Sequence, residues 1–188
     1  MQSPLTTDRL IVRDWTTSDS DVQAALALYG RPEVTEWLTP VVANVADLAA
    51  MRAVVQAWIE SQPNLVPPTG RWAMQRRSDD VVVGGLVLRM LPPYDHDLEL
   101  TWQLRPEVWG HGYATEAASA LLRWAFTFDI DAVFGLALPD NTRAIATAER
   151  IGMEWVGETT KYYDTSLQVY RIRQGDLPSG PTLGAPQD

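Results

Sequence analysis

Cysteine is absent from the sequence, and histidine occurs only twice, at His96 and His111. Without cysteine the chain can form no disulfide, no cysteine-ligated zinc site and no acyl-cysteine intermediate. Two histidines leave little room for a histidine-based metal cluster or for a serine–histidine–aspartate triad. A metal site at Asp95, His96, Asp97 and Glu99 is an alternative, but this run follows two prolines in a turn and lacks ligands at helical spacing. We therefore expect no metal cofactor.

Long apolar runs and an excess of basic residues are absent too. No stretch approaches the roughly 18 apolar residues of a membrane-spanning helix, and no basic-then-apolar leader opens the chain. We therefore expect a cytoplasmic protein that does not bind membranes. The formal net charge of −9 argues against nonspecific nucleic-acid binding. This charge is compatible with cationic substrates, although solubility is its simpler explanation.

The residues that are present fit one globular domain, since 46% of the 188 are apolar. Short β-branched runs predict strands, and apolar periods of three and four residues predict helices. The expected strands are residues 9–13, 71–75, 81–90, 98–104, 132–138, 154–161 and 167–174, and the expected helices are residues 22–29, 44–61, 113–128 and 141–151. Strands followed by helices, mixed with hairpins, indicate an α/β (α+β) fold with one mixed sheet and helices on both faces. We place a single domain in residues 1–174 and expect a disordered tail in residues 175–188.

Gly110 and Gly112 lie just before the helix expected to begin near Tyr113. Free amides and the positive end of the dipole make such a helix start an anion site, and glycine lets the backbone approach the anion. The segment has no lysine, which excludes a nucleoside-triphosphate loop. A dinucleotide fingerprint would need a third glycine where Thr115 stands, although Asp131 lies at a suitable distance for a ribose contact. A third possibility is a loop that holds a pyrophosphate by its backbone amides.

The run WGHGYATEA, residues 109–117, resembles the acyl-CoA signature of the GNAT superfamily of N-acyltransferases, in the branch typified by RimJ and RimL. Three further stretches match in order: TDRL at 7–10, ELTW at 99–102, and Asn141 followed by RIGM at 150–153. The resemblance covers about residues 5–174. It implies the GNAT fold, with a mixed sheet of six or seven strands that splays between the strands at 98–104 and 132–138.

The same resemblance implies acetyl-CoA as co-substrate, with its pantetheine arm in the splay and its pyrophosphate on the glycine loop. Asn141 is by itself a good helix N-cap, and the resemblance adds a contact with the cofactor. The residues implied in cofactor binding are Trp102, Gln103, Leu104, Trp109, Gly110, His111, Gly112, Tyr113, Ala114, Thr115 and Asn141.

The implied reaction is transfer of an acetyl group to an amine, directly and within a ternary complex, because no cysteine can carry the acetyl group. Glu99 is the candidate base, since a partly buried carboxylate has a raised pKa and can accept an ammonium proton. The alternative is a solvated strand residue, because alternation places Glu99, Thr101 and Gln103 on one face.

The acid that protonates the leaving thiolate is less evident. Family members often carry serine three residues after the conserved asparagine, and here that position is Ala144. Tyr162 and Tyr163, between the last two expected strands, are candidate acids, and Tyr113 lies in the glycine loop. If these tyrosines are structural, the thiolate leaves toward water or a helix dipole.

The acceptor is an amine, either a protein N-terminus or a small molecule such as a polyamine, an amino acid or an antibiotic. Trp37 is our preferred acceptor contact, because the segment from Trp37 to Gly70 shapes the acceptor site in the branch that the sequence resembles. Family analogy makes a homodimer plausible. A different class of function is a non-catalytic sensor or scaffold that binds acyl-CoA, which Ala144 weakly favours.

Overall fold

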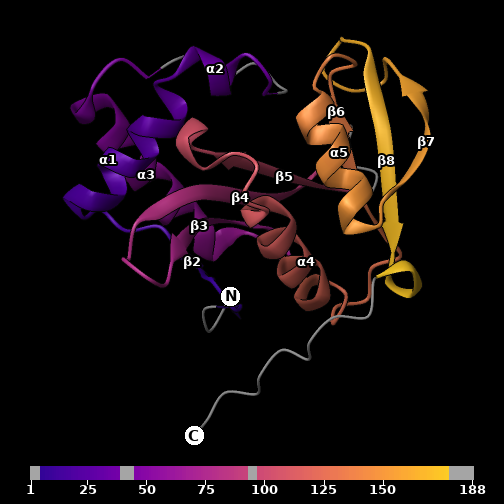
Figure 1. Cartoon of the computed structure of the whole chain (residues 1–188), viewed down its shortest axis with the longest axis horizontal. Helices are drawn as coiled ribbons and strands as arrows, with labels where there is room; N and C mark the ends of the chain where they lie inside the picture. The colour runs from indigo at the N-terminus through magenta and orange to yellow at the C-terminus, as the bar shows by residue number, and fades with distance from the viewer. Residues whose placement is uncertain (1–4, 39–44, 93–96, 178–188) are drawn as a thin grey trace, which may run out of the picture.

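A computed structural model describes residues 5–38, 45–92 and 97–177 of the chain. It contains one mixed sheet with the strand order β1-β2-β3-β4-β5-β6-β8-β7 (Figure 1). The strands are β1 (Leu5–Thr6), β2 (Leu10–Asp14), β3 (Gly70–Arg76), β4 (Val82–Met90), β5 (Leu98–Leu104), β6 (Ala132–Ala137), β7 (Glu154–Thr159) and β8 (Leu167–Arg173). The sheet has eight strands rather than the six or seven expected, because the two-residue β1 is too short to show a sequence period.

The helices are α1 (Asp19–Tyr29), α2 (Pro32–Thr35), α3 (Leu48–Ser61), α4 (Tyr113–Ala125) and α5 (Thr142–Ile151). Short 3-10 turns follow at Gln62–Asn64, Pro106–Val108 and Gln174–Asp176. The sequence did not predict α2, since four residues carry no helical period. The helix expected from residue 44 begins instead at Leu48, because the Asp47 side chain accepts a hydrogen bond from the Ala50 amide and caps it there; residue 44 itself lies outside the described residues.

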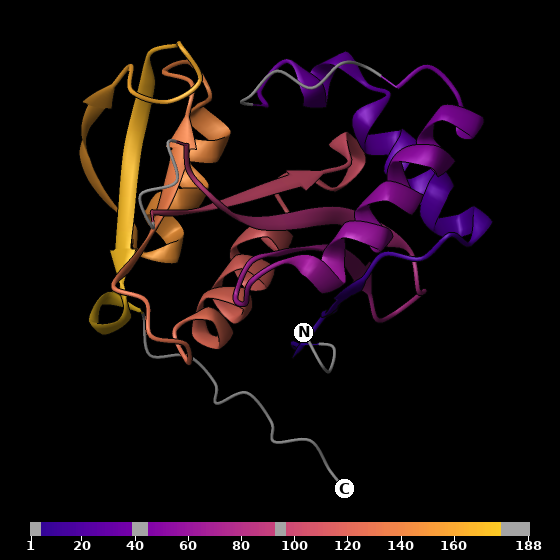
Figure 2. The ribbon, with the colours of Figure 1, turned by 180° about the vertical axis from the view of Figure 1, so that it is seen from behind.

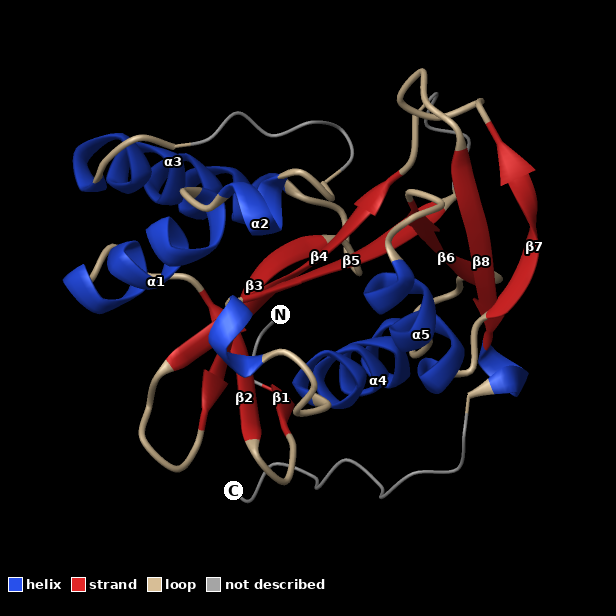
Figure 3. Cartoon of the chain, turned by 45° about the horizontal axis from the view of Figure 1, so that its top comes forward, coloured by secondary structure: helices blue, strands red, loops and turns tan. Residues whose placement is uncertain are grey.

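Two cores lie on opposite faces of the sheet. One joins α4 and α5 to inward residues of the central strands, among them Trp72, Leu100 and Leu121. The other joins α1 and α3 to the opposite face, through residues such as Ala73 and Leu28. Helices therefore cover both faces, as the sequence predicted. Figure 3 shows the two helical layers on either side of the central strands.

The sheet opens between β5 and β6. These parallel strands pair only at Leu98 with Val133 and at Glu99 with Phe134. Strand β5 nevertheless pairs with β4 along its whole length, up to Leu104, and β6 pairs with β8 along its own. The edge of β5 beyond Glu99 therefore has no neighbouring strand on the β6 side. Figure 2 shows the two halves of the sheet diverging from this point.

The C-terminal boundary lies a little beyond the expected one. Residues 174–176 form a 3-10 turn in which the Arg173 amide donates to Asp176 Oδ2 at 3.0 Å, so the expected disorder does not begin at Gly175. The rest of the tail, residues 178–188, lies outside the described residues. No helix in the described part of the chain is long and apolar enough to cross a membrane.

Candidate active site

A cavity of about 780 Å³ lies where β5 and β6 separate. Its lining includes Leu100 to Leu104 of β5 and Leu136 of β6, together with residues of α1, α2, the glycine loop and α5. This volume is within the range of small-molecule and cofactor sites, roughly 300–1,000 Å³. Because β5 contributes side chains from both of its faces, the cavity reaches both sides of the sheet through the splay.

The glycine loop forms one wall of this cavity. Gly110 and Gly112 both have φ of 78°, a left-handed conformation that favours glycine, and both line the cavity. Gly112 is the N-cap of α4 and provides no side-chain hydrogen bond. The amides of residues 110–115 donate no hydrogen bond to any described residue. The loop thus presents unused donors at the positive end of α4, which suits an anion such as pyrophosphate.

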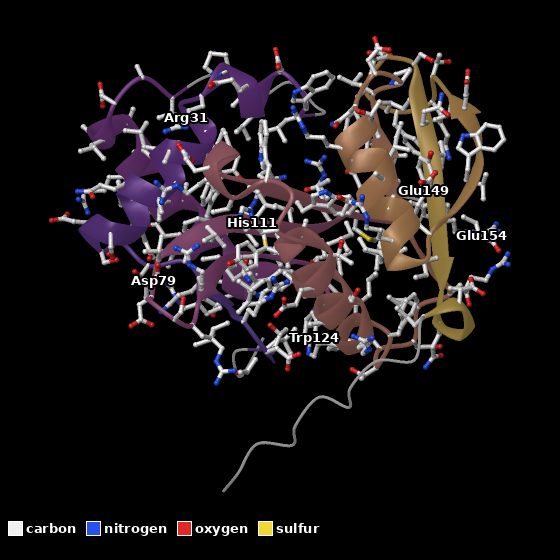
Figure 4. The ribbon with its side chains drawn as sticks, in the orientation of Figure 1. Arg31, Asp79, His111, Trp124, Glu149 and Glu154 are labelled. Atoms are coloured by element: carbon white, nitrogen blue, oxygen red, sulfur yellow. The ribbon has the colours of Figure 1, made fainter. Side chains whose placement is uncertain are left out.

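Some side chains of the glycine loop line the cavity, and others pack outside it. Trp109, Ala114 and Thr115 line the cavity with the glycines, whereas the side chains of His111 and Tyr113 do not. The His111 and Tyr113 rings stack with centroids 5.9 Å apart, close to the start of α4 (Figure 4). These two residues can therefore reach a ligand by their amides only.

A polar network outside the cavity fixes the loop. Glu116, in the first turn of α4, accepts hydrogen bonds from Thr7 Oγ1 at 2.5 Å, from the Arg9 amide at 2.9 Å and from Arg9 Nε at 2.6 Å. Arg9 also donates to the His111 carbonyl at 2.9 Å. Burial acts to raise the pKa of Glu116, but the bonds from Thr7 and Arg9 outweigh it and lower that pKa. The TDRL run near the N-terminus therefore positions the glycine loop.

Strand β5 contributes to both halves of the cavity. Trp102 and Leu104 pack toward the core of α4 and α5, and both line the cavity, as does Gln103 on the opposite face. The buried Gln103 Oε1 accepts a hydrogen bond from the Tyr29 hydroxyl at 3.0 Å. Burial raises the pKa of Tyr29 to about 12, so this phenol keeps its proton.

Asn141 caps α5, as the sequence predicted. Its Oδ1 accepts a hydrogen bond from the Ala144 amide at 3.1 Å, and both residues line the cavity. The methyl group of Ala144 thus forms part of the cavity wall, and it can donate no proton.

Glu99 is fully buried, so the alternative of a solvated strand residue is wrong. Its Oε2 accepts hydrogen bonds from Arg89 Nε at 2.8 Å and from the Tyr163 hydroxyl at 3.0 Å. Its Oε1 is buried and has no hydrogen-bond partner among the described residues. Burial raises the pKa of Glu99, while the Arg89 charge and the bonds from Arg89 and Tyr163 act to lower it. Glu99 does not line the cavity itself, but its partner Arg89 does.

The two candidate acids lie away from the cavity. Tyr162 is buried against Leu91 and Leu167, and its hydroxyl donates to Asp97 Oδ2 at 3.3 Å. Tyr163 is not on the described lining, and it contacts Glu99 by a hydrogen bond and Arg89 by its ring. Within the described residues, Tyr29 is the single tyrosine on the lining, and no sequence pattern pointed to it.

The structure adds charged residues that sequence patterns did not identify. Trp37 lines the cavity, as expected for an acceptor contact, but so do Glu33 of α2 and four arginines. These arginines are Arg71 of β3, Arg89 of β4, and Arg143 and Arg150 of α5. The Arg143 guanidinium lies 4.3 Å from the centre of the Trp109 ring, beside the glycine loop. The described lining is therefore locally cationic in a chain whose formal net charge is −9.

The metal alternative falls partly outside the described residues, because Asp95 and His96 are among those not described. The described residues contain no cluster of three or more potential metal ligands.

Comparison with known proteins matches residues 9–154 to the family described as acetyltransferase (GNAT) domain. YoaA, an uncharacterized N-acetyltransferase of Bacillus subtilis (strain 168), is 24% identical over an alignment 174 residues long that covers 87% of this chain and 93% of that protein. An acetyltransferase structure from Agrobacterium tumefaciens has a TM-score of 0.71 at 25% identity, covering 91% of this chain and 94% of the other. The ribosomal alpha-N-protein acetyltransferase RimL, in complex with coenzyme A, has a TM-score of 0.71 at 16% identity, covering 91% and 98%. Since the family match spans most of the sequence, the chain belongs to the GNAT acetyltransferase family.

Proposed function

We propose that the protein transfers an acetyl group from acetyl-CoA to an amine by direct attack within a ternary complex. The observation that carries this proposal is the cavity at the β5–β6 splay, which joins unused loop amides on one face of the sheet to a polar pocket on the other. Such a cavity can bring two ligands together without a covalent enzyme intermediate. The absence of cysteine agrees with that route.

In this proposal the cofactor occupies the half of the cavity next to α4 and α5. The amides of residues 110–115 and the α4 dipole hold the pyrophosphate, and the cation of Arg143 adds to the attraction. The pantetheine arm lies along the free edge of β5 at Trp102, Gln103 and Leu104, where it can pair with the strand as an added strand would. Asn141 stands at the end of this path.

The acceptor occupies the half between β5 and the first helices, where Trp37 lines the wall. Glu99 is the proposed base, and its unpaired Oε1 is the oxygen able to accept a proton. The amine nitrogen attacks the thioester carbonyl carbon, the carbon–sulfur bond breaks, and the thiolate takes a proton. Because Ala144 cannot donate one and neither Tyr162 nor Tyr163 lines the cavity, we propose that water relays to the thiolate the proton that the attacking nitrogen loses.

The protein-N-terminal acceptor of the RimJ/RimL branch and a small amine both remain within the proposal. The second candidate function, a non-catalytic sensor or scaffold that binds acyl-CoA, is favoured by the lack of a donor at Ala144. Both functions use the same glycine loop, so binding of coenzyme A alone does not separate them.

Release of free thiol from acetyl-CoA, measured against a panel of peptides and small amines, tests the proposal. If the protein is an acetyltransferase, the amount of thiol released should match the amount of acceptor acetylated. Mass spectrometry detects the acetylated acceptor. Binding of coenzyme A without turnover for any acceptor supports the sensor. A chain that does not bind coenzyme A contradicts both functions.

A further inference from the structure

Arg71 is a cation on the cavity lining without an anionic partner in the described part of the chain. It lies on β3, half-buried, and its guanidinium makes no ion pair or hydrogen bond with any described residue. Its one recorded contact is with the face of Trp58, whose ring centre lies 5.7 Å from the guanidinium carbon. Burial lowers the pKa of Arg71, while the nearby Tyr29 acts to raise it and the charge of Arg89 to lower it. Partial burial of a charged guanidinium without an anionic partner costs free energy. An anionic ligand that pairs with Arg71 would offset this cost.

The register of the sheet locates Arg71 relative to the reaction centre. Arg71 pairs with Val87 on β4, and Val87 pairs with Thr101 on β5, at the edge that faces the splay. All three line the cavity. Two strand spacings, about 10 Å, therefore separate the backbone of Arg71 from that of Thr101. The length of the arginine side chain allows its guanidinium to cover part of this distance.

Arg71 lies on the other side of the sheet from the glycine loop. Ala73, two residues along β3 and so on the same face as Arg71, belongs to the core beneath α1 and α3. Trp58, whose ring the Arg71 guanidinium contacts, is on α3. The loop amides and Arg143 lie on the side of α4 and α5. Arg71 therefore faces the acceptor half, and the phosphates of the cofactor do not account for it.

The rest of the acceptor half disfavours a second positive charge. Arg89 is a further cation there, although it is paired with Glu99. Tyr29 and Gln103 are uncharged donors and acceptors, and the single carboxylate on the described lining, Glu33, is exposed. A polyamine would bring a second ammonium group toward Arg71, which is repulsive. The chain's negative net charge thus does not predict the charge of this pocket.

We infer that the acceptor is an amine that also carries an anionic group, a carboxylate or a phosphate, which Arg71 binds while the amine lies near Thr101 at the splay. This inference rests on the proposed acetyl transfer. The guanidinium binds a carboxylate or phosphate through paired N–H donors. The separation of Arg71 from Thr101 selects molecules in which several bonds lie between the amine and the anion.

Matched acceptors that differ only in the anion test this inference. The pairs are lysine with cadaverine, tyrosine with tyramine, phosphoethanolamine with ethanolamine, and the peptide Ala-Glu-Ala-amide with Ala-Gln-Ala-amide. We expect kcat/KM to be about tenfold or more higher for the anionic member of at least one pair, as for other charged hydrogen bonds. The pair with the largest ratio identifies the source of the anion as an amino acid, a phosphorylated amine or an acidic peptide.

Substitution of Arg71 links the preference to this residue. Arg71→Gln is expected to lower kcat/KM for the preferred anionic acceptor about 10- to 100-fold. The kcat/KM for the matched acceptor that lacks the anion should change little, and the KM for acetyl-CoA should stay unchanged. Arg71→Lys keeps the charge and is expected to retain part of the preference. Arg171→Gln, on β8 and away from both the cavity and the glycine loop, is the matched control. Thermal unfolding of each variant verifies that it is folded.

Several outcomes overturn the inference. If uncharged amines are acetylated as well as their anionic partners, or if Arg71→Gln lowers turnover of both members equally, the inference is wrong and acetyl transfer stands. If no member of the panel turns over, calorimetry with N-acetyllysine and N-acetylcadaverine decides: equal binding by the native protein and Arg71→Gln contradicts a role for Arg71. Failure to bind coenzyme A contradicts the proposed function instead.

Discussion

Arg89 stands between the cavity and Glu99, donating to the buried Oε2 of Glu99 from Nε at 2.8 Å. This ion pair leaves Oε1 of the same carboxylate without a partner in the described structure. One oxygen of the carboxylate is therefore held by Arg89, and the other is buried and unpaired. Because Glu99 does not line the cavity, a proton from the amine would reach Oε1 through water.

Replacement of Glu99 by glutamine tests its role as base. A base must be ionised, so activity should rise as the pH rises through the pKa of Glu99, which burial places above its ordinary value. We expect Glu99→Gln to lower kcat about 100-fold or more at neutral pH, to remove this pH dependence, and to leave the affinity for coenzyme A nearly unchanged. Stopped assays across the pH range measure both effects.

The control is Glu158→Gln, on β7 and outside the cavity. Unchanged kcat in Glu99→Gln at every pH would reduce Glu99 to a structural partner of Arg89.

Gly112 tests the anion site on the loop. Alanine at its φ of 78° should cost about 1–2 kcal/mol of strain, whereas Gly112→Glu also places a carboxylate beside the amides that hold the pyrophosphate. We expect Gly112→Glu to abolish measurable coenzyme A binding in calorimetry and Gly112→Ala to weaken it. Gly157→Ala on β7, at φ of 131°, introduces comparable strain away from the site and should not change affinity. Normal binding by Gly112→Glu would refute this location for the pyrophosphate.

Asn141 combines two roles that substitution can separate. Asn141→Ala removes the N-cap of α5 and should destabilise the fold by about 1 kcal/mol. Asn141→Asp keeps the capping oxygen, so its unfolding temperature should stay close to that of the native protein while its added charge weakens coenzyme A binding. If neither variant alters the dissociation constant of coenzyme A, Asn141 acts as a cap only.

Glu116 ties the glycine loop to the N-terminal strand, and its lowered pKa makes a stability prediction. Since the folded-state pKa lies below the unfolded one, its contribution is complete above the unfolded pKa and is lost as the pH falls through the folded pKa. We expect Glu116→Gln to lower stability by about 1 kcal/mol at neutral pH, after allowance for solvent screening. Denaturant unfolding should show that the difference from the native protein shrinks in acid; a constant difference would contradict the linkage.

Trp37, in the turn after α2, is the proposed acceptor contact. Trp37→Ala should raise the KM for the acceptor about 5- to 30-fold, the equivalent of about 1–2 kcal/mol, and leave the KM for acetyl-CoA unchanged. Trp155→Ala removes a tryptophan that is 57% exposed on β7 and serves as the control. Equal KM values in Trp37→Ala and the native protein would exclude the contact.

Local patterns predicted well the elements that form the α4 side of the cavity. Strand β5 was expected at its observed bounds, and the glycine loop was expected before α4, because strand alternation, glycine spacing and helical period are all properties of neighbouring residues. Asn141 was recognised as a cap for the same reason. These features need no knowledge of distant contacts.

The acceptor half could not be predicted in this way. Arg71 faces the cavity only because β3, β4 and β5 adopt one register, and alternation within one strand does not give that register. Alternation also placed Glu99 on the correct face but could not show its burial, which depends on Arg89 and on Tyr163, 64 residues away. Tyr29 reaches Gln103 across 74 residues.

The opening between β5 and β6 also lies between the residues proposed to bind the cofactor and those proposed to bind the acceptor. The groups proposed to bind the cofactor lie on one side of the sheet, on the loop before α4 and on α5. The groups proposed to face the acceptor, Arg71 and Trp37, lie on the other, on β3 and in the turn after α2. A lineage can therefore exchange its acceptor through changes in α2 and β3 while the cofactor loop stays intact. The gap between β5 and β6 thus allows one proposed cofactor site to be combined with different acceptor sites.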